Sequence, residues 1–391
     1  MKKMLIVARG NEIGGGTEYI ITIIKMLHQK FNVDIHMTYS RESVKNNYLK
    51  YFDYVTFHHV PMVREINPKA DLKSIIRLVK LIKQEKFDIV HTNTSKGGVV
   101  GRIAARLAKV PFVFHTVHGF AFHEQSPRHS ILIYSQIEKF VAKYCNFIIT
   151  VSDFHKKWAE ELKIAPSDKI ISIPNGLDPN RVKPTVEREQ MRSQLGIQNN
   201  EIAIFTIGRL ATQKGIEYLL EAIAMLKNDQ IDSKYGFNIA GSGELEESLK
   251  NRAKELNIED KVRFLGFRSD VNNLLNAADI VVLPSLWEGL SIALLEAMAA
   301  KKAIICTEIG SNITVVEDKR DALVVKPKDV VGLKESIKLL IENEGLRNKI
   351  AEQAYKKFSI FFTKEIMLQK YYDFYKNKAM LDIKDGVTEL E

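Results

Sequence analysis

The chain has little cysteine and no long apolar run. Only Cys145 and Cys306 occur among its 391 residues. Both lie in apolar stretches, which indicates reduced core thiols rather than a disulfide scaffold, and a disulfide joining them is disfavoured. No apolar run approaches the roughly 18 residues that cross a bilayer, and the one at the N-terminus is too short for a signal peptide. We therefore expect a cytoplasmic protein whose residues 3–8 form a buried strand.

Motifs for metals and dinucleotides are also missing. No two aspartates are separated by a single residue, so the Asp-x-Asp metal motif is absent. His115, His118 and His123 lie close together, but no carboxylate or thiol pattern completes a ligand set. The run at 14–16 is not Gly-x-Gly-x-x-Gly, and no acidic residue clearly ends the second expected strand. We expect neither a metal nor a cofactor.

Charge is divided unevenly along the chain. Residues 1–180 carry 26 Lys and Arg against 16 Asp and Glu, a net charge of +10, whereas residues 181–391 carry 31 against 32. Such a surplus favours an anionic partner. Three candidates are a membrane surface, a lipid diphosphate and nucleic acid. No recognised nucleic-acid motif or aromatic–basic interleaving is present, so nucleic acid is not expected.

One stretch of the basic half has an amphipathic pattern. Residues 71–86 place five lysines and arginines around an apolar stripe. The plainer interpretation is a helix that covers a sheet and turns a basic face to water. The functional interpretation is docking on anionic lipid headgroups.

Short apolar runs alternate with helical periodicity throughout, which predicts an α/β fold with two Rossmann-like, doubly wound parallel sheets. We place one domain at 1–178 and the other at 179–362. The segment 174–179 has turn chemistry and a hinge is expected there. An aromatic-rich helix should cover 363–379, and a disordered tail is expected over 381–391.

Two carboxylates dominate the second domain. Glu288 follows an expected strand, and Glu296 falls about a turn and a half into the next helix. Amides at that helix N-terminus, near Gly289, Leu290 and Ser291, can bind an anion. Two acids beside an anion site make sense as acceptors for hydroxyls. The pattern therefore predicts a ligand with phosphates and hydroxyls, such as a nucleotide sugar.

Cations and glycines follow the neighbouring strands. Arg209 and Lys214 come after the strand expected at 202–207 and together can neutralise a diphosphate. Gly208 lies beside them. Gly241 and Gly243 follow the next strand, where glycines permit either a ligand's approach or only a tight turn.

These segments resemble the family 4 glycosyltransferases, which have the GT-B fold of two domains facing a cleft. The resemblance rests on Glu288 and Glu296 followed by Ala-Met, on the Arg209 and Lys214 loop, and on the Gly-x-Gly turn. Ile173-Pro-Asn-Gly-Leu-Asp resembles the family's interdomain segment, and His118-Gly119 resembles its acceptor-side motif. In this family the last helix crosses back to the first domain.

The resemblance implies a retaining glycosyltransferase that needs no metal and takes a nucleotide sugar, with a UDP-sugar favoured. Glu296 would hold the ribose, Glu288 would face the sugar and diphosphate, and Arg209 with Lys214 would stabilise the departing diphosphate. His118 would hydrogen-bond the donor sugar. The remaining implied contacts are donor binding by Gly15 and Gly16, and acceptor-side roles for Thr17 and His123.

The stretch 115–124 looks like bacterial enzymes of capsule, exopolysaccharide or lipid-linked oligosaccharide synthesis. A glycan or polyprenyl-diphosphate-linked acceptor follows by analogy, as does a peripheral position on the inner face of the cell membrane. The alternative is a non-catalytic nucleotide-sugar-binding or scaffold relative. Paired acids also serve glycoside hydrolases, but that interpretation leaves Arg209, Lys214 and the glycine turns unexplained.

Overall fold

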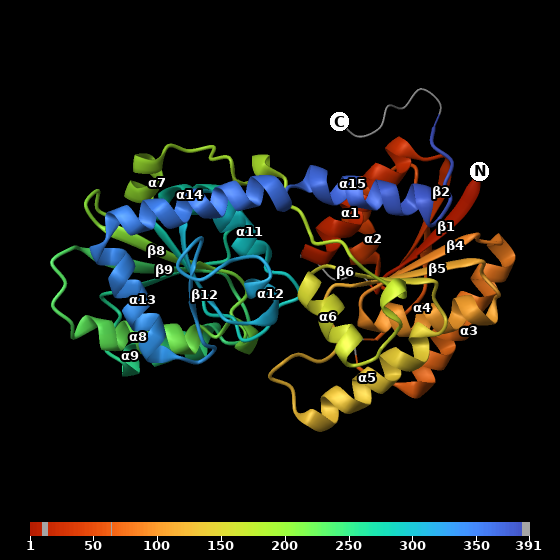
Figure 1. Cartoon of the computed structure of the whole chain (residues 1–391), viewed down its shortest axis with the longest axis horizontal. Helices are drawn as coiled ribbons and strands as arrows, with labels where there is room; N and C mark the ends of the chain where they lie inside the picture. The colour runs from red at the N-terminus through yellow and green to blue at the C-terminus, as the bar shows by residue number, and fades with distance from the viewer. Residues whose placement is uncertain (10–14, 64, 385–391) are drawn as a thin grey trace. The chain divides into compact units, whose positions relative to one another are not determined.

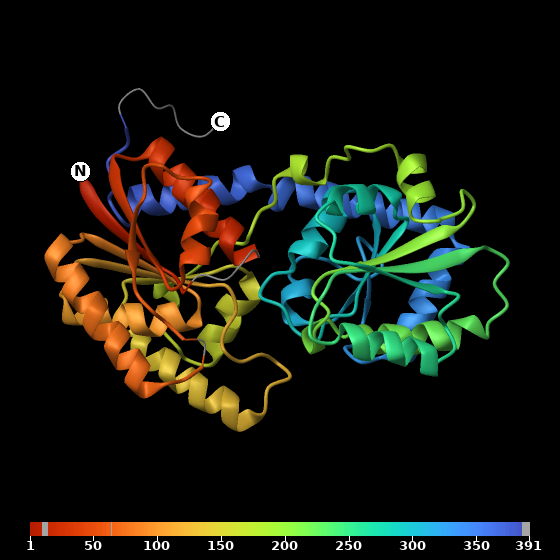
Figure 2. The ribbon, with the colours of Figure 1, turned by 180° about the vertical axis from the view of Figure 1, so that it is seen from behind.

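The computed structural model describes residues 1–9, 15–63 and 65–384, which fold into two compact units (Figure 1). Unit 1 contains Met1–Asn175 and the segment from Glu365 onward, and unit 2 contains Gly176–Lys364. Each unit is built on its own parallel sheet, seen from behind in Figure 2. The predicted fold class of two parallel α/β sheets is confirmed.

Unit 1 has a seven-stranded sheet in the order β3-β2-β1-β4-β5-β6-β7, and every neighbouring pair is parallel. Side chains of a strand alternate between the two faces of the sheet. In β1, Met4 and Ile6 therefore join one core cluster, and Leu5 and Val7 join the other. The strands are β1 Lys2–Val7, β2 Val33–Tyr39, β3 Thr56–His59, β4 Ile89–Asn93, β5 Phe112–Val117, β6 Phe147–Thr150 and β7 Ile170–Ser172.

Helices cover both faces of this sheet. Helices α1, α2 and α15 pack on the Met4 side, whereas α3, α4, α5 and α6 pack on the Leu5 side. Crossover helices on both faces are what a doubly wound parallel sheet requires. The helices are α1 Gly15–Lys30, α2 Glu42–Leu49, α3 Pro68–Glu85, α4 Ser95–Leu107, α5 Arg128–Ala142, α6 Asp153–Glu161 and α15 Lys364–Asn377.

The final helix, α15, is built into unit 1 by its aromatic side chains. Tyr371, Tyr372 and Tyr375 are fully buried. The hydroxyl of Tyr375 lies 2.8 Å from His91 Nδ1. The prediction of a disordered tail from residue 381 is wrong for 381–384, because Leu381 is buried and Ile383 pairs with Phe31. The remainder of the predicted tail, 385–391, lies outside the described residues.

Unit 2 has a six-stranded parallel sheet in the order β10-β9-β8-β11-β12-β13. Its strands are β8 Ile202–Ile207, β9 Tyr235–Ala240, β10 Val262–Gly266, β11 Ile280–Leu283, β12 Ala303–Thr307 and β13 Leu323–Val325. Its helices are α7 Arg188–Gln194, α8 Ile216–Lys227, α9 Glu246–Glu255, α10 Val271–Ala277, α11 Ile292–Ala299, α12 Gly310–Ile313, α13 Val330–Glu342 and α14 Glu344–Phe361.

The expected hinge is a paired segment of unit 2. The amide of Leu177 donates to Phe362 O at 2.9 Å, and that of Lys364 donates to Leu177 O at 3.0 Å. A Cβ on Gly176 would lie 2.1 Å from Thr363 O, so a glycine is needed for this approach. The segments by which the chain enters and leaves unit 2 are therefore hydrogen-bonded to each other.

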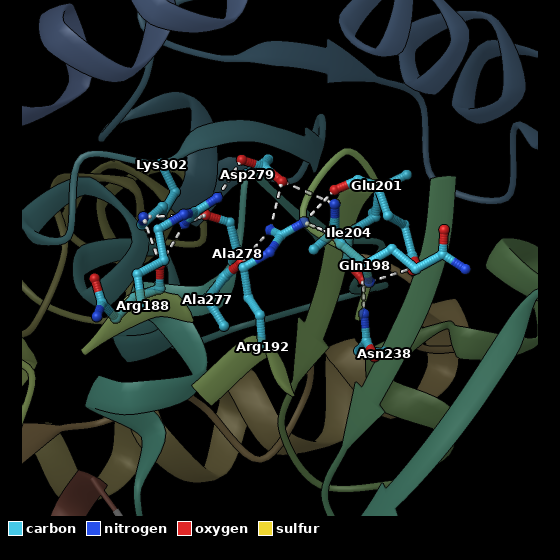
Figure 3. Close-up of polar contacts among 12 residues, drawn as sticks. Arg188, Arg192, Gln198, Glu201, Ile204, Asn238, Ala277, Ala278, Asp279 and Lys302 are labelled. Carbon is cyan, nitrogen blue, oxygen red and sulfur yellow. Dashed lines mark hydrogen bonds and ion pairs between the residues drawn. The ribbon is translucent and has the colours of Figure 1, made fainter. Parts of the chain in front are cut away.

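A polar network fastens α7 to the amino ends of β8 and β11 (Figure 3). Asp279 accepts from Arg188 at 2.6 Å and from Arg192 at 3.2 Å, and it also accepts from the Ala203 amide. Lys302 Nζ donates to Ala278 O at 3.1 Å, and burial lowers the pKa of Lys302 to about 8. Because cations stabilise a helix C-terminus, this cluster anchors the end of α10. The cluster lies at the amino ends of the strands. Ligands of open parallel sheets bind at the opposite, carboxyl ends.

Candidate active site

Two loops meet at the carboxyl ends of β8 and β11. The strands are parallel neighbours, so the chain leaves both at the same edge. Gly215 has φ +61°, and a Cβ there would lie 2.2 Å from Pro284 O. The amide of Leu286 donates to Gln213 O at 2.7 Å. A glycine at 215 thus lets the Lys214 loop lie directly against the Glu288 loop.

This contact brings Lys214 to Glu288. Lys214 Nζ lies 2.6 Å from Glu288 Oε1, and Ser285 Oγ donates to the same oxygen at 2.9 Å. Gln213 Nε2 donates to Glu288 Oε2 at 3.0 Å. The carboxylate is therefore held by three donors from two loops, in a fixed orientation beside a cation.

Glu296 lies on α11 and is buried, with its side chain 8% exposed. Arg181, in the short 3₁₀ turn Pro179–Val182, donates from Nε to Glu296 Oε1 at 2.8 Å. Burial raises the pKa of Glu296, while the charges of Arg181 and Lys214 oppose that rise. Lys214, which pairs with Glu288, thus also lies near enough to Glu296 to favour its charged form.

The other predicted residues of unit 2 surround this pair. Ser291 caps α11 by accepting from the Leu294 amide at 3.3 Å, and it follows Gly289 and the buried Leu290. The backbone amides of these three residues lie at the positive end of α11. Arg209 is exposed, and its guanidinium has no hydrogen-bond or ion-pair partner within the described residues. It is free to meet a ligand anion at the end of β8.

The glycines after β8 and β9 allow close loop contacts. A Cβ on Gly241 would lie 1.8 Å from the carbonyl oxygen of Gly208, and one on Gly243 would lie 2.3 Å from Leu210 O. The Gly208 Cβ position is 3.3 Å from Lys214 Cε, so its absence gives the lysine room. These glycines let the loops that carry Arg209 and Lys214 lie close to the loop after β9.

His118 occupies the carboxyl end of β5 in unit 1. Its Nε2 lies 3.2 Å from Asn93 Oδ1, and its ring packs edge-on against Tyr19 with centroids 4.6 Å apart. Burial lowers the pKa of His118 to about 4, so the imidazole is neutral at pH 7. A neutral imidazole can donate one hydrogen bond and accept another.

A buried polar chain supports Tyr19 behind His118. The Tyr19 hydroxyl lies 2.8 Å from that of Tyr371 and 3.2 Å from Thr116 Oγ1. His91 Nε2 lies 2.8 Å from the same Thr116 hydroxyl. Burial lowers the pKa of His91 to about 3, which makes it a neutral structural residue. Helix α15 thus fixes the side chain on which His118 rests.

The remaining predicted residues of unit 1 lie at the start of α1 and in the loop after β5. Gly15 and Gly16 open α1, and a Cβ on Gly16 would meet nothing within 4 Å, so its surroundings are open. Thr17 is half-buried in the first turn. His123 is half-buried in the loop after β5, where its amide donates to Ser126 Oγ at 3.0 Å. Residue 14, part of the glycine run, lies outside the described residues.

Three polar side chains of the site were not anticipated. Gln213 and Ser285 position Glu288, and Arg181 contacts Glu296 from 115 positions earlier in the chain. Gln213 and Ser285 adjoin predicted residues, so sequence proximity was an available signal. No sequence spacing points from Arg181 to Glu296, because tertiary packing alone brings them together.

Within residues 1–9, 15–63 and 65–384, no three His, Cys, Asp or Glu side chains converge as a metal-binding group. Among the helices of that same part of the chain, none has the length and apolarity to cross a membrane.

Known proteins share this architecture and both halves of the sequence. Residues 13–181 match the model of "Glycosyltransferase Family 4", and residues 187–357 match that of "Glycosyl transferases group 1". The chain resembles Anabaena HepE solved in complex with UDP, with a TM-score of 0.81 and 21% identity over 96% of this chain and 100% of that one. This structural likeness establishes the fold.

Sequence relatives extend the match over most of the chain. One is the UDP-Gal:alpha-D-GlcNAc-diphosphoundecaprenol alpha-1,3-galactosyltransferase of Escherichia coli, 37% identical over 81% of this chain and 84% of that protein. Another is the capsular polysaccharide biosynthesis glycosyltransferase CapM of Staphylococcus aureus, 26% identical over 89% of this chain and 90% of that protein. With both sheets, the paired glutamates and these matches in place, the chain belongs to the family 4 glycosyltransferases of GT-B fold.

Proposed function

We propose that this glycosyltransferase moves a sugar, with retention of anomeric configuration, from a UDP-sugar to a glycan or polyprenyl-diphosphate-linked acceptor in bacterial surface polysaccharide synthesis. The observation that carries the proposal is the Lys214–Glu288 ion pair at the ends of β8 and β11, with the buried Glu296 on the helix α11 that follows. The relatives add support, because the Escherichia coli enzyme is named for a UDP-galactose donor and a diphosphoundecaprenol acceptor.

The donor would be held through both of its chemical features. Arg209, Lys214 and the amides at the start of α11 suit a diphosphate, since each brings positive charge to the same sheet edge. Glu296 is an acceptor on a buried helix face and suits the ribose hydroxyls. Glu288 is oriented by Ser285 and Gln213 and suits the transferred sugar and the diphosphate.

Catalysis would depend on charge that develops as the diphosphate departs. A fixed ammonium near the leaving oxygen stabilises that charge without reorganisation. Lys214 is paired with Glu288 at 2.6 Å, so it is already positioned when the donor arrives. We propose that these cations make a divalent metal unnecessary. His118, neutral at pH 7, would serve the acceptor side as a hydrogen-bonding group.

We further propose that the protein works at the inner membrane surface as a peripheral protein. A polyprenyl-diphosphate acceptor is embedded in lipid, whereas the described helices do not span it. The basic surplus of residues 1–180 would favour anionic lipid.

The test is donor turnover by the purified chain. Each of several nucleotide sugars is incubated with and without a chelator, and nucleotide release is measured with and without lipid-diphosphate acceptors. Release from one UDP-sugar that persists in chelator, together with an α-linked product from an α-linked donor, supports the proposal. Wild-type turnover by Glu296→Ala or Arg209→Ala that remains folded would sink the site assignment. Binding without turnover for every donor would favour the scaffold alternative.

A further inference from the structure

Helix α5 leaves an apolar face uncovered. Its inner side is buried on the sheet through Ser135, Val141 and Ala142. On the outer side, Leu132 is 61% exposed, and Ile133 and Phe140 are 56% and 52% exposed. Ile133 and Phe140 are seven residues apart, which is about two helical turns, so their side chains share one face, and Leu132 lies beside that face. The fold of unit 1 does not need large apolar groups there.

The charge on this outer face has one sign. Arg128, Lys139 and Lys143 are exposed on α5 or directly after it. Glu138 is the only carboxylate in the helix, and it is buried. Arg102 Nη2 donates to Glu138 Oε2 at 2.7 Å. The face therefore combines apolar side chains with cations and has no acidic residue of its own.

A cavity of about 440 Å³ opens where α5 ends. Four lysine side chains line it, together with four apolar residues. Its single lining carboxylate, Glu160, accepts from Ser167 Oγ at 2.6 Å. Such a pocket suits a phosphate group attached to an apolar body. The lining residues are Lys139, Ala142, Lys143, Glu160, Lys163, Ile164, Ala165, Pro166 and Lys169.

A purely structural account covers only part of this arrangement. Lysines are favoured at helix C-termini, which explains Lys143 after α5 and Lys163 after α6. It does not explain why Phe140, between two lysines of the cavity, is half exposed to solvent. An exposed apolar row with flanking cations is the composition of helices that lie in a lipid interface.

We infer that the outer face of α5, with the lysine cavity at its end, docks this protein on an anionic phospholipid bilayer. Leu132, Ile133 and Phe140 enter the region below the headgroups, and the cavity receives a lipid phosphate. Charge complementarity selects this occupant, because the face is cationic and a second copy would bring like charge against it. The inference specifies the surface for the peripheral association proposed above.

The sequence had pointed to a different helix. Residues 71–86 cover most of α3 and its C-cap Lys86, and Leu72 and Ile76 are 57% and 61% exposed beside lysines. Helix α4 lies between α3 and α5 on the same face of the sheet (Figure 1). The basic cavity, however, adjoins α5 and not α3. The two helices therefore make distinguishable predictions.

The experiment measures flotation of the full chain with phosphatidylcholine vesicles, with and without phosphatidylglycerol. Because a near-surface cation contributes about fivefold to binding anionic lipid, Lys139→Gln with Lys143→Gln should weaken binding by about 30-fold. Leu132→Ser with Phe140→Ser should weaken it at least about tenfold, since apolar burial is lost. The matched control is Ile360→Ser with Phe361→Ser, equally exposed apolar residues on α14 of unit 2.

Salt-sensitive binding that both α5 pairs weaken and the α14 pair preserves supports the inference. Equal binding by the α5 pairs and the parent overturns it, as does loss of binding in Leu72→Ser with Ile76→Ser alone. A parent dimer that the α5 pairs dissociate, without vesicle binding, would make the face a self-association surface instead. Nucleotide release from a soluble donor is measured in parallel and should not change, so failure here is separable from failure of the proposed reaction.

Discussion

Arg181 offers the sharpest test of the donor site. We expect Arg181→Met to make donor binding fail at a higher pH than in the parent. Glu296 is buried, and burial raises its pKa, while Arg181 opposes that rise. The ionised carboxylate accepts hydroxyls, so donor affinity is present above the pKa of Glu296 and is lost as the pH falls through it. Without Arg181 that pKa rises further, and the loss moves upward.

The magnitude follows from the exposure of the two partners. Breaking a fully buried ion pair costs about 3–5 kcal/mol. Here the Glu296 side chain is 8% exposed but that of Arg181 is 38% exposed, so solvent screens part of the interaction. We therefore take about 1.4 kcal/mol, which is about tenfold in donor affinity below the midpoint.

The assay is calorimetric titration with the donor nucleotide across a range of pH. Arg181→Lys retains the positive charge and should keep most of the parent's profile. Glu296→Gln should bind weakly with no such pH dependence. An unchanged midpoint in Arg181→Met would refute the reasoning. Urea unfolding adds a check. Because the pKa of Glu296 in the folded state is raised above 4.5, stability falls as the pH rises from 4.5 through that pKa. Glu296→Gln should therefore be at least as stable as the parent at pH 7.

Further predictions concern stability and the loops. The pKa of His118 is lowered from 6.5 to about 4, so its neutral form stabilises the fold, and this stability is lost as the pH falls through that window. In urea unfolding at acid pH, His118→Gln should lose about 3 kcal/mol less stability than the parent. Gly215→Ala should cost well over 1 kcal/mol and abolish donor binding, since its Cβ would meet Pro284 O. Gly196→Ala, at a similar φ with nothing within 4 Å, should cost about 1 kcal/mol in thermal unfolding and leave activity intact, and equal effects at both positions would contradict the clash. Arg192→Met should destabilise the fold by about 3 kcal/mol, because the Arg192 side chain is 4% exposed. Arg188→Met should cost about 1 kcal/mol and leave the donor KM unchanged, because the Arg188 side chain is 32% exposed. The reverse order in chemical denaturation would refute this.

The strands of both sheets follow closely from the sequence. The strand predicted at 202–207 coincides with β8, because a parallel strand buried on both faces is a continuous apolar run. Helices α2 and α7 were missed. Each has only two buried residues, Val44 and Tyr48 in α2 and Met191 and Arg192 in α7, which is too few for a periodic signal.

The sequence also singled out candidate site residues that the structure brings together, but it did not predict their pairing. Glu288 and Lys214 were each predicted from the strand end that precedes them, yet their 2.6 Å contact depends on β8 and β11 being neighbours. The same holds for Gly241 and Gly243. Their close contacts with Gly208 O and Leu210 O depend on β8 and β9 being neighbours.

By itself, the sequence determined the two parallel α/β sheets, the family and the residue types at the strand ends, because apolar periodicity and short motifs are local properties of a chain. Only the tertiary structure decided that Arg181 neutralises Glu296, that Tyr371 supports Tyr19 beneath His118, and that α5 keeps Phe140 in solvent. Those outcomes depend on burial and on contacts between distant segments, which are set when strand order brings particular loops and helices together.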